Sequence, residues 1–294
     1  MSLVQKTRVV LEMIKFEHSI FALPFALTGA MLAIRGAGLT TQELAWKLLW
    51  IVVAMVAARS AAMAFNRVVD ADIDAENPRT QMRAIPAGQV SKSFTWGFIT
   101  LWSAVFVFAS WRLNSLCLAL SPVALAVVLG YSYTKRFTAM AHLVLGLALG
   151  IAPLAAWIAI RGEFSWPVTL LSAAVMLWVA GFDVIYSCQD ADFDRDRGLH
   201  SLPAALGVGR ALALSRLFHV AMVGLLVWLW SLAHLGWVGL AGIAVVAALL
   251  AWEQSLVSAD DLSRVDAAFF TLNGFVSLLF CVFWGLDLFV FPAA

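Results

Sequence analysis

Apolar runs of about twenty residues recur along this chain of 294 residues, and they constrain its fold more than any other feature. A helix of about 20 apolar residues is long enough to cross the hydrocarbon core of a bilayer. Hydrophobic residues make up 63% of the chain and charged residues 13%, whereas soluble domains have about half and about a quarter. We therefore expect an all-α, polytopic membrane protein, because helices satisfy their own backbone hydrogen bonds in lipid.

The apolar runs predict nine transmembrane helices, separated by Gly, Pro and charged residues. We expect them at residues 17–35, 46–69, 94–111, 114–134, 141–160, 166–189, 211–232, 235–257 and 267–290. We also expect them to form one compact domain over residues 1–294.

Lysine and arginine predict the orientation of these spans. Fourteen of the nineteen fall in segments on the side of the N-terminus, four on the other side, and Arg59 lies within the second span. Because cytoplasmic segments are enriched in Lys and Arg, the N-terminal side is expected to be cytoplasmic, as in a bacterial inner membrane.

Other features exclude several classes. The first fifteen residues carry no small-residue cleavage site, so we expect no cleavable signal peptide. Cys117, Cys188 and Cys281 form no CxxC pair and are interpreted as buried structural thiols. The net charge of +1 says nothing about nucleic acid, but the sequence has no basic tract, so we expect no nucleic-acid partner.

Two similar acidic pentapeptides follow two of the predicted spans: DADID at Asp70–Asp74 and DADFD at Asp190–Asp194. Nine of the eighteen acidic residues lie in the two stretches 70–76 and 183–196. Four predicted spans separate the two pentapeptides, so both are expected on the cytoplasmic side.

Helical spacing groups these acids into two motifs. Residues four apart share a helix face, so we define the first acidic motif as Asn66, Asp70 and Asp74. The second acidic motif is Asp183, Asp190 and Asp194, spaced seven and four residues apart.

Asp72 and Asp192 point elsewhere and are expected to be solvated. Helix-end capping does not explain the two motifs, because acids at a helix C-terminus oppose the helix dipole. Mg²⁺ prefers oxygen ligands and is commonly held by carboxylates together with substrate phosphates. The motifs therefore indicate a site for Mg²⁺ and a diphosphate.

Three segments carry a resemblance to a known family. The run NRVVDADIDAENPRTQMRAIPAG resembles the first signature of the UbiA family of intramembrane aromatic prenyltransferases, and DVIYSCQDADFD resembles the second. YSYTK at 131–135 is similar to the family's Tyr-xxx-Lys element. The resemblance implies nine helices around a central cavity, Mg²⁺, a polyprenyl diphosphate donor, an aromatic acceptor and a role in ubiquinone or menaquinone biosynthesis.

The candidate site residues follow from the motifs and the cations near them. The expected metal ligands are Asn66, Asp70, Asp74, Asp190 and Asp194. The expected catalytic residues are the four aspartates of that set together with Lys135. The expected substrate-binding residues are Arg59, Arg79, Arg83, Tyr131, Arg136, Asp183, Tyr186 and Arg195.

Several of these assignments have alternatives. Arg59 either contacts the substrate or pairs structurally with an acid of the motifs. Tyr131 and Tyr186 either stabilise a carbocation through their ring faces or simply pack. Of the histidines, His200 is a candidate substrate contact, as is His18, whereas His142, His219 and His234 are interpreted as interfacial or packing residues.

The acceptor is open between two classes. Enzymes acting on 4-hydroxybenzoate have Arg and Pro near the first span where this chain has Lys15 and Ser19. A lysine lacks the bidentate fork that holds a small carboxylate, and the segment is more like the futalosine branch of menaquinone synthesis. We therefore expect 6-amino-6-deoxyfutalosine to be preferred over 4-hydroxybenzoate.

Two other classes compete with prenyl transfer. A secondary transporter also carries intramembrane charges, but its site usually lies near the bilayer midplane, whereas these acids gather at one face. A CDP-alcohol phosphotransferase would need a Gly-punctuated Asp motif on consecutive turns of one site, and the chain has two separate clusters instead.

Overall fold

A computed structural model describes residues 3–13 and 23–292, which form helices, turns and bends without a strand in those ranges. The chain divides into two compact units. The first unit comprises Met1–Ser19 and Trp46–Tyr133, and the second comprises Ile20–Ala45 and Thr134–Ala294. The acidic motifs fall in different units, so each is described within its own.

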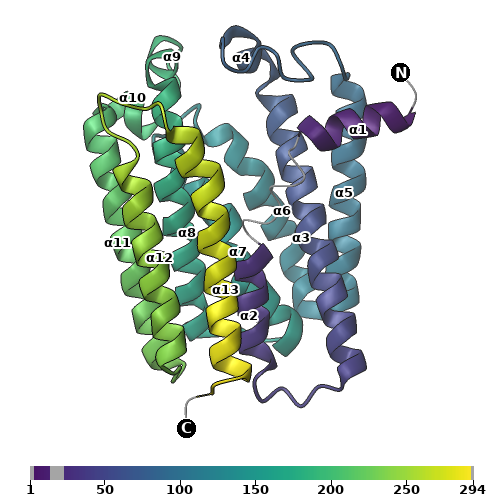
Figure 1. The fold of residues 1–294 in the computed structure, drawn as a ribbon. Coiled ribbons are helices and arrows are strands. Elements are labelled where there is room, and N and C mark those ends of the chain that lie inside the picture. Colours follow the sequence, from purple (N-terminus) through teal and green to yellow (C-terminus); the bar gives the residue numbers. More distant parts are fainter. Residues whose placement is uncertain (1–2, 14–22, 293–294) are drawn as a thin grey trace. The chain divides into compact units, whose positions relative to one another are not determined.

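The first unit is built on three long helices with two shorter ones. Its helices are α1 (Leu3–Met13), α3 (Thr41–Val69, whose first turn belongs to the second unit), α4 (Ala71–Glu76), α5 (Lys92–Leu113) and α6 (Ser115–Thr134). Figure 1 shows α1 lying across α3 and α5. Val10 of α1 is fully buried there, in one apolar cluster with Val68 of α3 and Phe98 of α5. Helix α1 was not predicted from the sequence.

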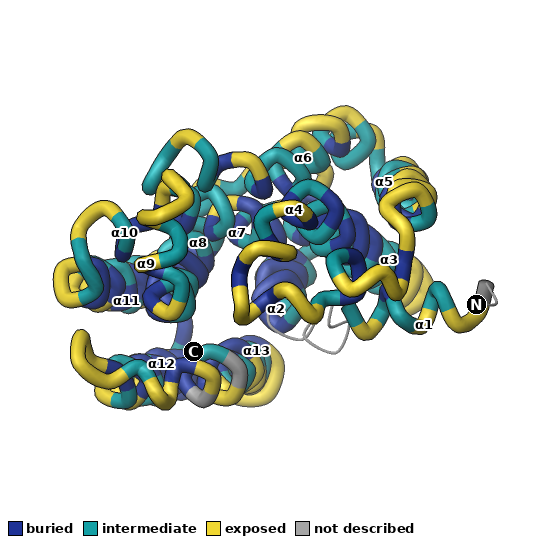
Figure 2. Tube along the Cα trace, turned by 90° about the horizontal axis from the view of Figure 1, so that it is seen from above, coloured by how far each residue is buried: buried dark blue, intermediate teal, exposed yellow. Residues whose placement is uncertain are grey.

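The second unit contains the remaining helices. They are α2 (Leu23–Ile34), α7 (Ala141–Arg161), α8 (Trp166–Ser187), η2 (Cys188–Asp190), α9 (Ala191–Asp196), α10 (Leu202–Leu206), α11 (Val208–Leu232), α12 (Trp237–Ser255), the π-helical η3 (Ala267–Leu272) and α13 (Asn273–Phe289). Helix α8 packs against both α7 and α11, and Figure 2 shows it as largely buried.

Small residues let α7 and α8 approach closely. Gly146 and Gly150 lie one turn apart on α7, and a Cβ at either position would collide with the backbone of α8. Such GxxxG spacing is typical of helix contacts in membranes, where close backbone packing replaces the hydrophobic effect. The same face of α7 carries His142 one turn before Gly146.

Two charged side chains complete helix ends in the second unit. Asp287 of α13 accepts hydrogen bonds from the backbone N–H groups of Gly236 and Gly239, at the start of α12. Arg161 at the end of α7 donates to the carbonyl oxygens of Ala33 (2.8 Å) and Arg35 (2.6 Å), at the end of α2. Each supplies a partner to backbone groups that a helix terminus leaves unpaired.

A buried polar network links α8, α12 and α13. Asn273 accepts from the Trp178 indole N–H (2.7 Å) and donates to Glu253 Oε1 (3.1 Å). It also lies within hydrogen-bond distance of the carbonyl oxygens of Ala268 and Phe269, in the π-helical segment. Glu253 is fully buried, an arrangement that the sequence analysis did not anticipate.

The predicted fold class is confirmed. Seven of the described helices are long and apolar enough to cross a membrane, and two shorter apolar helices, Leu23–Ile34 and Asn273–Phe289, match the first and ninth predicted spans. The prediction of one domain over residues 1–294 stays a prediction. The three cysteines are free, as expected, but only Cys188 is buried, and the other two are half-buried.

Candidate active site

The first acidic motif lies where α3 passes into α4. Helix α3 ends at Val69, one residue before Asp70, so the motif does not lie on one continuous helix as expected. The backbone hydrogen bonds nevertheless keep helical spacing across the break: Asp70 N–H to Asn66 O (2.9 Å) and Asp74 N–H to Asp70 O (2.7 Å). The three side chains therefore stay on one side of the chain.

The carboxylates of this motif are buried. Asp70 is 2% exposed and Asp74 4% exposed. Asn66 Nδ2 donates to Asp70 Oδ2 (2.9 Å), and Arg83 Nη1 donates to Asp74 Oδ1 (2.7 Å). Asp74 Oδ2 is buried and has no hydrogen-bond partner in the described part of the chain. A buried carboxylate oxygen without a partner is costly, so this atom is a candidate ligand for a cation.

Sequence reasoning missed two residues that support this motif. Arg67 Nη1 lies 3.4 Å from Asn66 Oδ1, and its guanidinium interacts electrostatically with both aspartates and with Tyr131. The Thr80 hydroxyl donates to the backbone carbonyl of Asp74 (3.0 Å), which ties the following loop to α4. A charged residue beside Asn66 in an apolar span was the available signal for Arg67.

The alternate aspartates of both pentapeptides are exposed, as predicted. The Asp72 side chain is 90% exposed and pairs with Lys92 (2.8 Å), and the Asp192 side chain is 93% exposed and pairs with Arg195 (2.9 Å). Arg195, a predicted substrate contact, therefore lies in an exposed ion pair.

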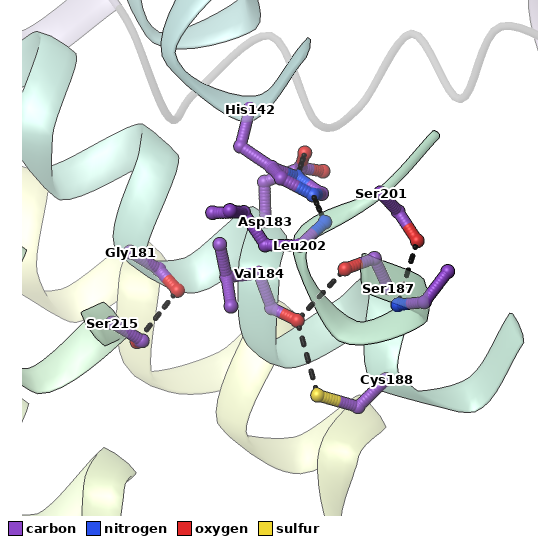
Figure 3. Close-up of polar contacts among 10 residues, drawn as sticks. His142, Gly181, Asp183, Val184, Ser187, Cys188, Ser201, Leu202 and Ser215 are labelled. Atoms are coloured by element: carbon purple, nitrogen blue, oxygen red, sulfur yellow. Dashed lines mark hydrogen bonds and ion pairs between the residues drawn. The ribbon is translucent and has the colours of Figure 1, made fainter. Parts of the chain in front are cut away.

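The second acidic motif spans the end of α8, the 3-10 turn η2 and the start of α9. Side chains bond to backbone carbonyls on both sides of Asp183, as Figure 3 shows. Ser215 of α11 donates to Gly181 O (2.8 Å), while Ser187 and Cys188 both donate to Val184 O (2.9 and 3.3 Å). These bonds support the last turns of α8 around Asp183.

His142 contacts the second motif directly. Its Nδ1 lies 2.7 Å from Asp183 Oδ2, and its Nε2 accepts a hydrogen bond from the backbone N–H of Leu202 (3.2 Å). Figure 3 shows the imidazole between these two partners. The interpretation of His142 as a packing residue was incomplete, because the partner of this buried ring is an acid of the motif.

Asp194 has partners on two other segments. The Ser201 hydroxyl hydrogen-bonds the Asp194 carboxylate, and Lys135 and His142 both interact with that carboxylate electrostatically. Asp190 lies close enough to Asp194 for the two charges to interact. Asp190 and Asp194 are both half-buried, unlike the fully buried pair of the first motif.

The other predicted residues have mixed surroundings. Arg59 is half-buried within α3, Arg136 is half-buried after α6, and Arg79 is exposed; all three make contacts of their own. The Tyr186 ring packs against Phe269 with ring centroids 4.3 Å apart.

Among the remaining predictions, His200 is exposed, and its backbone N–H donates to the Lys135 carbonyl (2.7 Å). Lys15, His18 and Ser19 lie outside the described residues.

The oxygen atoms of these motifs fit Mg²⁺. Asn66, Asp70 and Asp74 offer hard oxygen ligands, and one of them, Asp74 Oδ2, is buried without a partner in the described ranges. Over the same residues, no three acidic, histidine or cysteine side chains gather as a complete metal cage. Mg²⁺ does not require such a cage, because phosphate oxygens and waters usually complete its coordination.

Comparison with known proteins identifies the class. The model of the UbiA prenyltransferase family matches residues 22–286, which include both acidic motifs. The chain belongs to this family, and it is a multi-pass membrane prenyltransferase.

Individual relatives agree with this assignment. The chain is 31% identical over 231 residues to 4-hydroxybenzoate octaprenyltransferase of Cupriavidus necator, covering 76% of this chain and 79% of the relative. It is 29% identical over 226 residues to the Cupriavidus metallidurans protein of the same name, covering 76% of both chains.

Solved structures show the same fold. The apo structure of a UbiA homolog from Aeropyrum pernix is 37% identical, with a TM-score of 0.82, and covers 91% of this chain and 97% of that chain. A UbiA homolog from Archaeoglobus fulgidus, solved with DMAPP and Mg²⁺ bound, is 18% identical with a TM-score of 0.69 and covers 96% and 99%.

Proposed function

We propose that this protein transfers a polyprenyl group from a polyprenyl diphosphate to an aromatic acceptor, with Mg²⁺ as cofactor, in ubiquinone or menaquinone biosynthesis. In this proposal both acidic motifs act on the same diphosphate. Family membership supports prenyl transfer, and it favours this reaction over a secondary transporter and over a CDP-alcohol phosphotransferase. Ligands bound to the Archaeoglobus homolog support the choice of Mg²⁺ and an allylic diphosphate.

The observation that carries the proposal is the first acidic motif. Three oxygen-bearing side chains lie at helical spacing, and the buried Oδ2 of Asp74 has no partner within the described ranges. Arg83 pairs with the other oxygen of Asp74. A divalent cation would compensate the remaining negative charge, and a diphosphate would complete its coordination.

The first chemical step is loss of diphosphate from C1 of the polyprenyl chain. The C1–O bond breaks, the oxygen keeps the electron pair, and the allylic cation is delocalised. Bound Mg²⁺ stabilises the negative charge that develops on the diphosphate. Lys135, Arg136 and Arg79 would act on the same charge as positioned cations, and Arg83 would share its guanidinium between Asp74 and the diphosphate.

The second step is attack of the aromatic ring on C1. A ring carbon of the acceptor forms the new C–C bond, and the ring then loses a proton and becomes aromatic again. Tyr131 and Tyr186 would stabilise the cation through a ring face, and Arg59 would contact the acceptor or the diphosphate. Exclusion of water prevents quenching of the cation to prenol, which suits a site formed by membrane-spanning helices.

The acceptor has two candidates with different support. The names of the Cupriavidus relatives favour 4-hydroxybenzoate. The presence of Lys15 and Ser19 favours 6-amino-6-deoxyfutalosine, because a lysine offers a point charge instead of a bidentate fork. We retain the prediction that the futalosine-type acceptor has the higher kcat/KM.

One parallel assay tests the proposal. Purified full-length protein in lipid nanodiscs is given a labelled polyprenyl diphosphate and Mg²⁺, with each acceptor in turn. Prenylated acceptor and diphosphate should appear in equal amounts. Absence of product with both acceptors would contradict the aromatic assignment, and a clear preference for 4-hydroxybenzoate would overturn the acceptor prediction.

The orientation of the protein is part of the proposal. The excess of Lys and Arg on the N-terminal side supports a cytoplasmic N-terminus and a cytoplasmic active site. Single cysteines placed at Asp72 and at the loop residue Glu163, in a cysteine-free background, should be labelled from opposite sides of inverted vesicles. Labelling of both from the same side would contradict this topology.

A further inference from the structure

We propose that His142 is a positioning residue of the second acidic motif, which orients the Asp183 carboxylate and ties it to the 199–202 segment. This inference rests on the proposed function. The assignment of His142 is independent of the family signatures, because it comes from side-chain contacts within the second unit.

The hydrogen bonds around His142 define its tautomer. Nε2 accepts a hydrogen bond from the backbone N–H of Leu202, so the neutral imidazole carries its proton on Nδ1. The Nδ1–H group then donates a hydrogen bond to Asp183 Oδ2. The Asp183 side chain is 22% exposed whereas the His142 side chain is 5% exposed. A buried donor thus holds Oδ2 of a carboxylate that is itself still partly exposed.

The position of His142 follows from the packing of α7. His142, Gly146 and Gly150 are four residues apart and therefore share one face of the helix. The two glycines bring α7 against the backbone of α8. Because this approach is close, the short His142 side chain reaches Asp183 near the end of α8.

The 199–202 segment connects this contact to the rest of the second motif. Leu199 N–H donates to Asp194 O (2.8 Å), and His200 N–H donates to Lys135 O (2.7 Å). The Ser201 hydroxyl bonds the Asp194 carboxylate.

Leu202 completes this connection, since its backbone N–H donates to His142 and it is 1% exposed. Leu199, His200 and Ser201 therefore each contact a predicted site residue, and Leu202 contacts His142. His142 fixes the end of the segment that lies nearest Asp183.

The hydrogen bond from His142 would fix the direction in which the Asp183 carboxylate points. A carboxylate that binds a metal or its waters works best when a second group fixes its direction, and loss of such a group typically costs about 10–100-fold in metal affinity or activity. His142 would thus lower the Mg²⁺ concentration at which the enzyme works, without touching the reacting atoms.

His142→Ala, His142→Asn and the control His219→Asn test this role in full-length protein in nanodiscs. The amide nitrogen of Asn replaces Nδ1 as a donor to Asp183. His219 is the matched control because it is also buried and packs on α8, but its Nε2 lies 3.3 Å from a backbone carbonyl, that of Trp178. All three proteins should give one folded peak and a cooperative melt.

Two readouts are compared for each variant. One is the Mg²⁺ concentration at half-maximal turnover, and the other is Mn²⁺ binding in the presence of inorganic diphosphate, followed by electron paramagnetic resonance. We expect His142→Ala to weaken both by about 10–100-fold, His142→Asn by less than about threefold, and His219→Asn not at all. Unchanged metal binding in folded His142→Ala protein would overturn the inference.

A double-mutant cycle covers the case in which His142→Ala acts only through stability. If His142 acts through Asp183, the loss in His142→Ala/Asp183→Asn should equal the loss in Asp183→Asn alone. Additive losses would show that His142 acts elsewhere. Failure of the wild-type protein to transfer prenyl groups would instead refute the proposed function, so the two failures are distinguishable.

Discussion

The two acidic motifs have nearly the same sequence but different surroundings. In the first motif Asp70 and Asp74 are both buried, and Arg83 pairs with Asp74. In the second motif the corresponding aspartates are half-buried. The supporting contacts there include a histidine, His142, and a hydroxyl, that of Ser201, and the Lys135 cation interacts with Asp194 electrostatically.

This difference shows which part of a site a motif specifies. The repeated pentapeptide supplies oxygen atoms at fixed spacing, which is what a metal–diphosphate complex requires. The neighbouring segments supply the partners of these acids, and those partners differ between the two units. We therefore expect removal of the Arg83 cation to disturb the first motif most, and removal of the His142 hydrogen bond to disturb the second motif most.

Alanine at the aspartates of both motifs should have the largest effect. Asp70→Ala, Asp74→Ala, Asp190→Ala and Asp194→Ala should each lower kcat by at least about 100-fold, the order expected when electrostatic stabilisation of a transition state is lost. Steady-state assays at saturating donor measure this directly.

The exposed aspartates of the same pentapeptides are the controls. Asp72→Ala and Asp192→Ala remove carboxylates that pair with Lys92 and Arg195 on the surface, so kcat should change by less than about threefold, since such pairs contribute little. Equal losses at all six positions would contradict the assignment of faces.

The exposure of Asp72 and Asp192 was predictable from the sequence, whereas the contacts of the other acidic residues were not. Spacing of four residues was enough to separate Asp70 and Asp74 from the exposed Asp72. His142 lies 41 residues from Asp183, and only the packing of α7 on α8 brings the two together. The GLALG stretch at 146–150 was the one available signal of that close approach.

Removal of Arg83 should distinguish the first motif from the second. Arg83→Ala leaves the Asp74 carboxylate buried without its charged partner, which should cost about 1.5–3 kcal/mol of stability, as for other hydrogen bonds to charged groups. Added Mg²⁺ with diphosphate should restore part of the thermal stability in nanodiscs.

Lys92→Ala is the matched control, because Lys92 also pairs with an aspartate of the first pentapeptide but on the surface. Its effect on stability should be about 0–1 kcal/mol. If the free energy of unfolding falls equally in Arg83→Ala and Lys92→Ala, then the buried ion pair contributes no more stability than the exposed one.

Substitution of Glu253 should have the smallest effect, although this acid is more deeply buried than those of the motifs. Glu253→Gln keeps an oxygen for Asn273 and replaces a buried ionisable group with a neutral amide of similar shape, so stability should change by less than about 1 kcal/mol or increase. Asn273→Ala should cost about 1–3 kcal/mol, since it leaves both Glu253 and the Trp178 N–H without their partner.

Thermal melts and turnover measure both variants, and Glu253→Gln should leave kcat unchanged. A loss of turnover in stable Glu253→Gln protein would show that burial of an acid, and not membership of a motif, predicts its role in catalysis.

The helices themselves were predicted closely where an apolar run was bounded by charge or glycine. Helix α7 was expected at 141–160 and occupies Ala141–Arg161, and α8 was expected at 166–189 and ends at Ser187. The end of α3 at Val69 agrees with the expected span 46–69, whereas the break after Ser187 falls before the expected end at residue 189. The aspartate-rich segment there continues the helical spacing on both sides of the break, so the sequence did not reveal it. Tertiary contacts determine where such helices are interrupted.

The most direct test of the central claim is diphosphate release by the wild-type protein with and without a chelator. The protein is given a labelled polyprenyl diphosphate and both acceptors, first in Mg²⁺, then in excess EDTA, then after Mg²⁺ is restored. The account predicts that prenylated acceptor and diphosphate form in equal amounts, cease in EDTA and return with Mg²⁺. Full turnover in excess EDTA, or diphosphate release without prenylated acceptor, would contradict it.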